Sequence, residues 1–257
     1  MRLTPNAAAS WSARRPIIVA HRGASADAPE NTLAALRLGF AQGADYGECD
    51  VRLTRDGAVV LLHDESLRRT AGVEARVAEL TLAELHGFEV GAWCGELWHG
   101  EKIPTLAEAL AQVPEGRRLL IEIKSGPATV RAVAAALGGF AASGRDPVAV
   151  AVLMSFDPAV TVEARRVLPK IERHWLTEER APVASLCEQA RAVGCTALNV
   201  SRALSIDVAF VATARDAGLD VFVWTVDDVA EARRLVVAGV HGLTTNRPGG
   251  LRGEWPS

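Results

Sequence analysis

Three short groups of polar residues near the start of the chain contain side chains that can perform chemistry. They are the adjacent pair His21 and Arg22, the closely spaced pair Glu48 and Asp50, and His63. Because Glu48 and Asp50 lie two residues apart in a stretch with the pattern of a strand, their side chains leave the same face and can bind one cation. The spacing therefore predicts a metal site with two imidazoles and a guanidinium nearby.

Glu122 and Lys124 form a second pair with this spacing, again in a stretch with the pattern of a strand. Carboxylates without a cysteine among them suit a hard, oxygen-preferring ion such as Mg²⁺ or Ca²⁺ better than zinc. We therefore expect Glu48, Asp50 and Glu122 to bind one divalent cation. The choice between Mg²⁺ and Ca²⁺ stays open, since Glu and Asp serve both ions.

Arg22 and Lys124 then require an anion of their own. A metal ion, an arginine and a lysine around one cavity can neutralise and polarise a phosphate during displacement. His21 and His63 provide an acid and a base, each typically worth about 10²–10⁴ in rate. Together these residues predict metal-assisted cleavage of a phosphodiester, with His21 and His63 catalytic and with Arg22 and Lys124 in contact with the phosphate.

Short β-branched runs alternate with amphipathic runs along the whole chain. We expect strands at residues 17–20, 46–53, 119–123, 148–154, 171–176, 197–200, 221–226 and 242–245. Helical patterns fall at residues 32–42, 105–112, 128–142, 158–167, 182–193, 206–217 and 228–238. This order predicts an α/β protein, a closed (β/α)8 TIM barrel. The alternative, an open doubly wound sheet, usually has a glycine-rich phosphate turn after its first strand, where this chain has His21-Arg22-Gly23.

The second βα unit is irregular. A hairpin is expected at residues 51–62, with Asp56-Gly57 at its turn. Residues 65–104 are too long for a plain βα connection and contain several glycines as well as Trp93 and Trp98. We expect a small insertion here, after the second strand, that covers one end of the barrel. The chain as a whole, residues 1–257, is expected to form a single domain.

The barrel explains how the polar groups meet. In such barrels the chemistry takes place at the carboxyl ends of the strands. The first strand ends at His21 and Arg22, the second carries Glu48 and Asp50, and the third delivers Glu122 together with Lys124. Adjacent strands therefore bring the predicted site together.

Composition restricts the classes of partner. Of the 257 residues, 49% are hydrophobic, which suffices for a large core, and the formal net charge is −3. This charge gives no general attraction to nucleic acid or anionic membranes. Residues 1–15 have no apolar run of signal-peptide length, and no segment has the roughly 18 consecutive apolar residues of a membrane span. We expect a cytoplasmic protein with a small-molecule substrate, without nucleic acid or stable membrane association; the oligomeric state stays open.

A series of short motifs extends through almost the whole chain: His21-Arg22-Gly23, Ala28-Pro29-Glu30-Asn31-Thr32, Gly43-Ala44-Asp45, Glu48-x-Asp50-Val51, Thr54-x-Asp56-Gly57, Val60-x-x-His63-Asp64, Leu67-x-Arg69-Thr70, Ile103-Pro104-Thr105-Leu106, Glu122-x-Lys124, Ser155-Phe156 and Val223-Trp224-Thr225-Val226. Taken together they resemble the glycerophosphodiester phosphodiesterase family. The resemblance implies a barrel that hydrolyses glycerophosphodiesters to sn-glycerol 3-phosphate and an alcohol, within lipid and glycerol metabolism.

The resemblance also implies roles for individual residues, which agree with those derived above. The family's metal ligands match Glu48, Asp50 and Glu122, its acid/base pair matches His21 and His63, and its phosphate contacts match Arg22 and Lys124. A mechanism proposed for the family begins with attack by the neighbouring glycerol hydroxyl, which gives a cyclic phosphate. The sequence leaves this route and direct attack by water open.

The chain departs from the family pattern near its end. His241 and Asn246 stand where the family usually has aspartates, and Asp227 stands where an asparagine is common after Trp-Thr-Val. Gly47 replaces an apolar residue before the metal-binding glutamate. Asn246 keeps the hydrogen-bonding shape of aspartate without its charge, so the effect of this exchange on contacts at the barrel mouth stays open.

Several site residues also have plainer interpretations. Glu122 and Lys124 can form a structural ion pair, and Arg22 can pair with Glu30 or Asp64. Phe156 and Trp224 either line the substrate pocket or belong to the core. Glu30 and Asn31 are expected to cap the first helix. The histidines without a motif are expected at the surface or in loops: His86, His99, His174 and His241.

Three other functions remain alternatives. The same site can cleave the headgroup from a lysophospholipid, a lysophospholipase D type activity that needs an apolar trough, for which the segment containing Trp93 and Trp98 is the candidate. A barrel of this kind can also act as a non-catalytic sensor of a phosphorylated ligand. Activity on cyclic or nucleotide diesters is a further enzymatic possibility. Assays with the respective diesters separate these functions.

Overall fold

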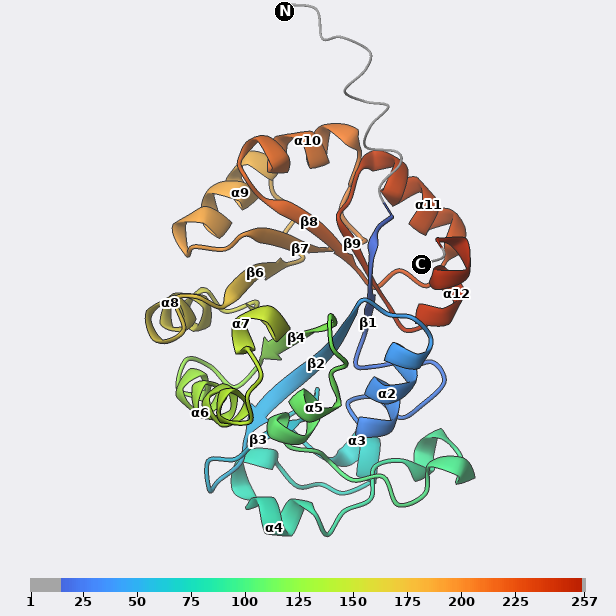
Figure 1. Ribbon diagram of the computed structural model, residues 1–257, viewed down its shortest axis with the longest axis vertical. Coiled ribbons are helices and arrows are strands. Elements are labelled where there is room, and N and C mark those ends of the chain that lie inside the picture. Colours follow the sequence, from blue (N-terminus) through green and yellow to red (C-terminus); the bar gives the residue numbers. More distant parts are fainter. Residues whose placement is uncertain (1–14, 256–257) are drawn as a thin grey trace, which may run out of the picture.

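The computed structural model describes residues 15–255 and shows a closed barrel of parallel strands inside a ring of helices (Figure 1). The parallel strands are β1 (Ile17–Ala20), β2 (Tyr46–Leu53), β4 (Arg118–Ile123), β5 (Ala151–Ser155), β6 (Glu172–Thr177), β7 (Ala197–Ser201), β8 (Asp220–Trp224) and β9 (Gly242–Thr245). Strand β1 pairs with both β2 and β9, which closes the sheet. The (β/α)8 prediction is therefore confirmed, and the open doubly wound sheet is wrong.

The helices around the barrel begin at side-chain caps that the sequence contains. Thr32, Asp157, Asp207 and Asp228 each accept a hydrogen bond from a backbone N–H in the first turn of the following helix. The surrounding helices are α2 (Leu33–Ala41), α5 (Leu106–Gln112), α6 (Thr129–Ala142), α8 (Pro158–Val167), α9 (Val183–Ala192), α10 (Val208–Asp216), α11 (Val229–Ala238) and α12 (Pro248–Glu254).

The hydrophobic core has an inner and an outer part. Inside the barrel, Val19, Leu120, Val152 and Phe222 belong to one buried cluster. Larger clusters lie between the strands and the surrounding helices, where burial of apolar side chains supplies most of the driving force for folding. The barrel is thus a filled core, and the chemistry is confined to one end of it.

The prediction was wrong at residues 148–150. These residues belong to a short helix, α7 (Pro147–Val150), and β5 begins only at Ala151. The physical reason is the cap, because the side chain of Asp146 accepts a hydrogen bond from Val148 N and Pro147 occupies the first helical turn. The short helix α12 was not predicted.

The hairpin of β2 and β3 and the segment that follows it lie together at one side of the barrel, outside the ring of strands (Figure 1). Strand β3 (Val59–Leu61) pairs antiparallel with β2, and Gly57 at the turn has a φ of 83°. The segment that follows contains short helices with a buried apolar cluster of their own: α3 (Arg68–Ala71), η1 (Val77–Glu79), α4 (Leu82–Leu85), η2 (Ala92–Cys94) and η3 (Glu96–Trp98). That residues 1–257 form one domain with an insertion at 65–104 stays a prediction.

In the described part of the chain, no helix is long and apolar enough to cross a membrane. The predicted absence of a signal peptide concerns residues 1–15, most of which lie outside the described residues. The predicted cytoplasmic location stays a prediction.

The expected surface position of His174 is wrong. Its side chain is fully buried in β6, with Nε2 at 3.0 Å from the carboxylate of Glu172. The other carboxylate oxygen of Glu172 accepts a hydrogen bond from Arg118 Nη1 at 2.6 Å. Glu172 and His174 lie in the amino-terminal half of β6, and Arg118 is the first residue of β4. All three are therefore away from the carboxyl ends of the strands, where the predicted site residues gather. The group holds strands together and belongs to the core.

Replacing Glu172 with glutamine is expected to lower stability at neutral pH. The hydrogen bonds from His174 and Arg118 lower the pKa of Glu172 to about 2 from its ordinary 4.5. The depressed pKa stabilises the fold above pH 4.5, and this contribution disappears as the pH falls towards about 2. With allowance for partial solvent screening, we expect Glu172→Gln to lose about 1–2 kcal/mol at pH 7. Urea unfolding at pH 7 and pH 3 checks this; an undiminished difference at pH 3 contradicts it.

Candidate active site

The turn after β1 is held tightly against its surroundings. Gly23 has a φ of 82°, and a Cβ atom there would lie 2.3 Å from the carbonyl carbon of Ala35, so the turn requires glycine. Arg22 has a φ of 55°, a left-handed conformation that is uncommon for a side chain of its size. In this conformation its backbone N–H donates to Glu48 Oε2 at 2.7 Å. The His-Arg-Gly turn is thereby tied to the acidic residues of β2.

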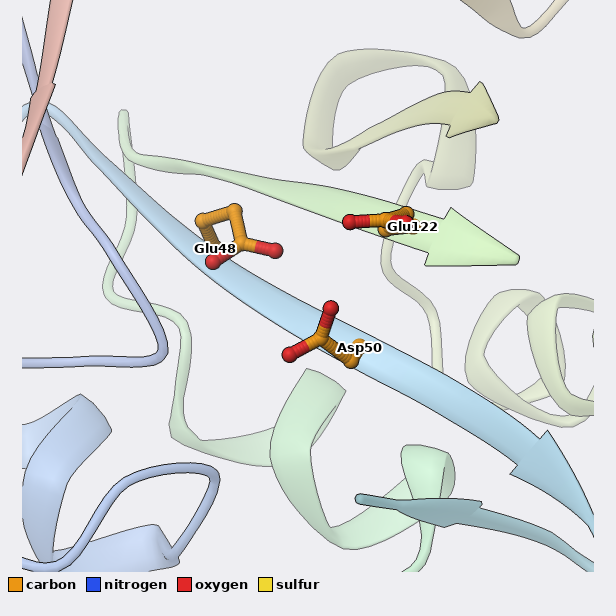
Figure 2. A group of neighbouring side chains, drawn as sticks. All are labelled: Glu48, Asp50 and Glu122. Carbon is orange, nitrogen blue, oxygen red and sulfur yellow. The ribbon is translucent and has the colours of Figure 1, made fainter. Parts of the chain in front are cut away.

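Glu48, Asp50 and Glu122 form one acidic cluster. Figure 2 shows their carboxylates projecting from β2 and β4 towards a common point. Asp50 lies opposite Glu122 in the parallel register, and one oxygen from each of the three residues lies within 4.8 Å of the others. All three are buried, with exposed fractions of 1%, 1% and 8%. The cluster predicted from the i, i+2 spacing is therefore present as a geometric group.

Burial and mutual repulsion shape the pKa values in the cluster. Burial, with the charges of Asp50 and Glu122, raises the pKa of Glu48 well above its ordinary value. Burial, with the charge of Asp50, raises the pKa of Glu122 to about 7. Burial also acts to raise the pKa of Asp50, but Arg22 and Lys124 outweigh it and hold that pKa below its ordinary value. Burial and mutual repulsion thus oppose the simultaneous ionisation of all three carboxylates when no cation is bound.

The donor set fits a divalent cation. Among residues 15–255, the hydrogen-bond partner of the Glu48 carboxylate is the backbone N–H of Arg22, which leaves an oxygen able to coordinate. Closely grouped buried carboxylates are costly without a compensating cation. Three carboxylate oxygens at this spacing are ligands that Mg²⁺ and Ca²⁺ both accept.

Arg22 and Lys124 contact the acidic cluster from either side. Lys124 Nζ lies 2.6 Å from Glu122 and 3.3 Å from Asp50. Arg22 Nη1 donates to Glu30 at 3.0 Å, and its Nε lies 3.1 Å from Asp50 without the geometry of a hydrogen bond. The plainer pairings of Lys124 with Glu122 and of Arg22 with Glu30 are therefore present. Both cations nevertheless line the pocket described below, where an anion can reach them.

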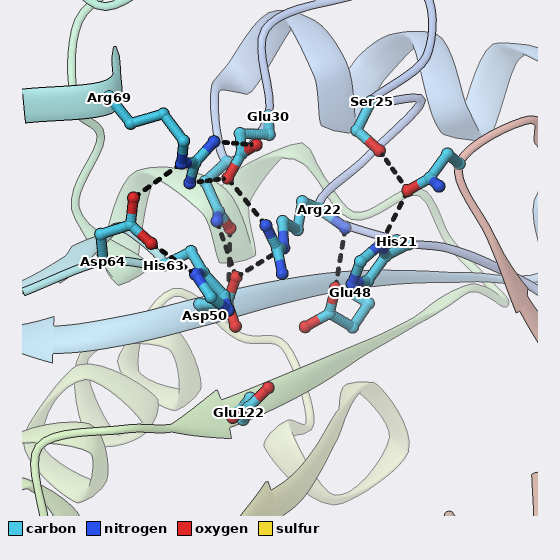
Figure 3. Close-up of polar contacts among 12 residues, drawn as sticks. His21, Arg22, Ser25, Glu30, Glu48, Asp50, His63, Asp64, Arg69 and Glu122 are labelled. Carbon is cyan, nitrogen blue, oxygen red and sulfur yellow. Dashed lines mark hydrogen bonds and ion pairs between the residues drawn. The ribbon is translucent and has the colours of Figure 1, made fainter. Parts of the chain in front are cut away.

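His63 is held through a chain of charged residues (Figure 3). Its Nδ1 lies 2.7 Å from Asp64, which also accepts a hydrogen bond from Arg69 Nε at 2.7 Å. Arg69 in turn donates to both carboxylate oxygens of Glu30. Burial lowers the pKa of His63, while Asp50 and Asp64 act in the opposite direction. His63 lines the pocket described below, and because Asp64 engages its Nδ1, Nε2 is the other ring nitrogen that a substrate can use.

His21 is held in a similar way by an uncharged partner. Its Nδ1 lies 2.7 Å from Asn246 Oδ1, and the hydroxyl of Ser25 donates to the same oxygen at 2.8 Å. Burial and the nearby charge of Arg22 lower the pKa of His21. Asn246, whose contacts were left open from the sequence, is thus a direct neighbour of a predicted catalytic residue.

A pocket of about 180 Å³ brings most of these side chains together. It is lined by His21, Arg22, Glu48, His63, Glu122, Lys124, Met154, Phe156, Leu176, Asn199, Trp224 and Thr244. Phe156 and Trp224 meet edge to face, with ring centroids 5.8 Å apart, at the wall of this pocket. Of the predicted site residues, Asp50 is the one that lies just behind the lining, in contact with Arg22 and Lys124.

Sequence reasoning assigned Asn31 to the wrong task. Thr32 caps α2, while the buried Asn31 donates to Asp50 Oδ2 at 2.8 Å and accepts from Asp50 N at 3.0 Å. Asn31 has a φ of 56°, a conformation that asparagine adopts more readily than most residues. Glu30 likewise binds Arg22 and Arg69. The sequence signal that could have indicated these contacts was the position of Glu30 and Asn31 in the motif Ala28-Pro29-Glu30-Asn31-Thr32.

His241, expected at the surface or in a loop, lies in the loop between α11 and β9. Its side chain is 17% exposed and forms an ion pair with Asp220 at 2.8 Å, while Nδ1 accepts a hydrogen bond from Val221 N. These contacts lie at the start of β8, away from the pocket. The departure from the family pattern at this position therefore leaves the acidic cluster untouched.

Comparison with known proteins gives a consistent result. Residues 21–250 match the model of the glycerophosphoryl diester phosphodiesterase family. The chain is 34% identical to YhdW of Bacillus subtilis, which carries the provisional name of a glycerophosphodiester phosphodiesterase, over 90% of this chain and 94% of that protein. It is 30% identical to the glycerophosphodiester phosphodiesterase of Caldanaerobacter subterraneus, over 91% of this chain and 95% of that one.

A solved structure is similar along nearly its full length. It is a phosphodiesterase from Oleispira antarctica in complex with the product sn-glycerol-3-phosphate. The TM-score is 0.84 at 30% sequence identity, and the match covers 97% of this chain and 99% of the other.

Proposed function

The chain belongs to the glycerophosphoryl diester phosphodiesterase family, and from this premise we propose that it hydrolyses glycerophosphodiesters to sn-glycerol 3-phosphate and an alcohol with one bound divalent cation. The observation that carries the proposal is the shared pocket, in which the acidic cluster, two imidazoles and two cationic side chains converge. The similar structure from Oleispira antarctica supports the choice of product, because that phosphodiesterase is in complex with the product sn-glycerol-3-phosphate.

The acidic cluster and the two cations have complementary tasks. Bound by Glu48, Asp50 and Glu122, Mg²⁺ or Ca²⁺ supplies a Lewis acid for the phosphate oxygens. Arg22 and Lys124 bind the phosphate from the side of the pocket and stabilise charge that develops on it.

The partners of the two histidines suggest different roles. The Asp64 carboxylate on Nδ1 of His63 stabilises the protonated ring, a support that the neutral partner of His21 does not give, so we assign the protonation of the leaving alcohol oxygen to His63. The neutral amide of Asn246 on Nδ1 of His21 leaves Nε2 free to accept a proton from the attacking hydroxyl. His21 is therefore the base and His63 the acid in the first step.

The size and lining of the pocket favour small diesters. A volume of about 180 Å³ suits a phosphate with short substituents, and Phe156 and Trp224 provide an apolar wall for the carbon atoms of the glycerol or the alcohol. We propose these two aromatic residues as substrate contacts. A small-molecule glycerophosphodiester is the proposed partner, in preference to a lysophospholipid.

The direct test is a coupled assay for glycerol 3-phosphate with metal-stripped protein. We expect turnover of glycerophosphocholine or glycerophosphoethanolamine after Mg²⁺ or Ca²⁺ is added, and little turnover without the ion. Lysophosphatidylcholine and bis(p-nitrophenyl) phosphate are the comparison substrates. A preference for lysophosphatidylcholine contradicts the proposed substrate class. Binding of glycerophosphocholine without any turnover indicates a sensor in place of an enzyme.

A further inference from the structure

Two residues at which the chain departs from the family pattern are in direct contact beside His21. Asp227 follows β8 and Asn246 follows β9. Asp227 Oδ2 accepts a hydrogen bond from Asn246 Nδ2 at 2.7 Å, and its Oδ1 accepts from Asn246 N, also at 2.7 Å. The hydroxyl of Thr245 adds a third hydrogen bond to Asp227 at 2.9 Å. The carboxylate therefore fixes both the backbone and the side chain of Asn246.

These contacts determine which way the amide of Asn246 points. An ionised carboxylate only accepts hydrogen bonds, so the NH₂ group of Asn246 must face Asp227. The amide oxygen must then face the opposite side, where the Ser25 hydroxyl donates to it and His21 Nδ1 lies at 2.7 Å. The orientation follows from chemistry on both sides of the amide, in agreement with the placement of its atoms.

The orientation of the amide in turn determines the tautomer of His21. An amide oxygen cannot donate, so the short contact requires a proton on His21 Nδ1. In the neutral ring, Nε2 then carries the lone pair. We propose that Asp227 and Asn246 form a positioning pair that holds His21 in the Nδ1-protonated tautomer, with Nε2 presented to the substrate as a proton acceptor. The hydrogen-bond part of this inference stands independently, whereas its catalytic consequence rests on the proposed function.

It matters chemically that the amide of Asn246, and not the carboxylate of Asp227, contacts His21 directly. A carboxylate directly on Nδ1, as Asp64 is on His63, orients a ring and also stabilises its protonated form. An amide orients the ring without adding that charge. Here the carboxylate of Asp227 contacts the far side of the Asn246 amide and does not contact the imidazole itself. The charged groups that act on His21 itself are Arg22, Asp50 and Glu30. The pair therefore orients His21 and keeps it a base.

The tautomer is measured directly in metal-free protein labelled with ¹⁵N-histidine. In long-range ¹H–¹⁵N spectra recorded at pH 8, His21 of the unchanged protein is expected to show a protonated Nδ1 and an unprotonated Nε2. His21→Gln assigns the signals. In Asn246→Ala and Asp227→Ala, we expect the His21 signals to become those of exchanging tautomers. An Nε2-protonated His21 in the unchanged protein, or an unaltered His21 pattern in Asn246→Ala, overturns the inference.

Kinetics test the catalytic consequence. Because an imidazole in the wrong tautomer cannot act as the base, we expect Asn246→Ala to lower kcat by about 10²-fold with a much smaller change in KM. Asp228→Asn is the control for an unspecific change in the same loop, since it removes a carboxylate next to Asp227 that does not contact Asn246, and asparagine caps a helix as well as aspartate does. It is expected to retain the kcat of the unchanged enzyme. Equal losses of kcat in Asn246→Ala and Asp228→Asn overturn the catalytic role.

The exchanged variant, Asp227→Asn with Asn246→Asp, keeps one carboxylate and one amide in contact. We expect it to fold even if the alanine variants do not, so that an effect on His21 can be told apart from misfolding. It places the carboxylate on His21, which stabilises the protonated ring. We expect retention of the Nδ1-protonated tautomer and a shift of the acidic limb of the kcat/KM profile to higher pH. An unshifted limb contradicts the role of the amide. If no glycerophosphodiester is hydrolysed, the proposed function fails, and the NMR result still decides whether the pair sets the tautomer.

Discussion

Replacement of Glu48 by glutamine is expected to abolish tight binding of the divalent cation and to lower kcat for glycerophosphocholine by at least about 10³-fold, on the order of 4 kcal/mol in the activation free energy. The substitution preserves size and removes one of three clustered carboxylates. Glu48 is the most informative of the three, because its carboxylate accepts a backbone hydrogen bond from Arg22, whereas Asp50 and Glu122 also pair with cationic side chains.

The measurement combines calorimetric titration of metal-stripped protein with Mg²⁺ and Ca²⁺ and the glycerol 3-phosphate assay. Glu172→Gln is the matched control, since it makes the same change to a strand glutamate outside the pocket and should keep ion binding and turnover. In the absence of metal, Glu48→Gln should be at least as resistant to heat as the unchanged protein, because it relieves repulsion within a buried acidic cluster. Unaltered ion affinity in a folded Glu48→Gln protein would rule out this cluster as the metal site.

His63→Ala is expected to lower kcat for glycerophosphocholine by about 10³-fold, and much less for a glycerophosphodiester with a p-nitrophenol leaving group. Choline is a poor leaving group and needs a proton from an acid, while p-nitrophenolate leaves without one. His21→Ala is expected to impair both substrates to a similar degree, since the attacking hydroxyl needs a base in either case. The contrast between the two substrates therefore assigns the roles of the histidines.

The comparison requires kcat and KM for both variants on both substrates. Folding of each variant is checked by its thermal midpoint, and His86→Ala provides a control at an exposed histidine outside the pocket. If His63→Ala loses as much on the p-nitrophenyl ester as on glycerophosphocholine, His63 is not the acid. If the selective loss appears in His21→Ala, the two roles are reversed.

The sequence was informative about the acidic residues because their chemistry depends on local spacing. Two carboxylates separated by one strand residue must share a face, whatever else the fold does. The register that places Asp50 opposite Glu122 is different, since it depends on how two strands pair across a barrel. The order of the βα units predicted that the two strands deliver their carboxylates to one end of the barrel, but the register itself was not predicted.

The supporting residues were harder to predict because their partners are distant in the chain. Asn31 was expected to cap a helix, yet its left-handed backbone turns the side chain towards Asp50. Asn246 was visible only as a departure from a pattern, and nothing local indicates that it meets His21. At residues 148–150, β-branched side chains suggested a strand, but the Asp146 cap and Pro147 start a helical turn.

The closure of the barrel between its first and last strands has a consequence for biosynthesis. The contact between His21 and Asn246 joins residues 225 positions apart, and β1 pairs with β9 over its whole length. His21, the proposed catalytic base, is thus made early by the ribosome, whereas β9 and the amide of Asn246 are made only after all the other strands of the barrel. Contacts so far apart in sequence form late and slowly in folding. A nascent chain therefore carries the acids and histidines in an incomplete barrel, and we expect the proposed activity to begin only after β9 has left the ribosome.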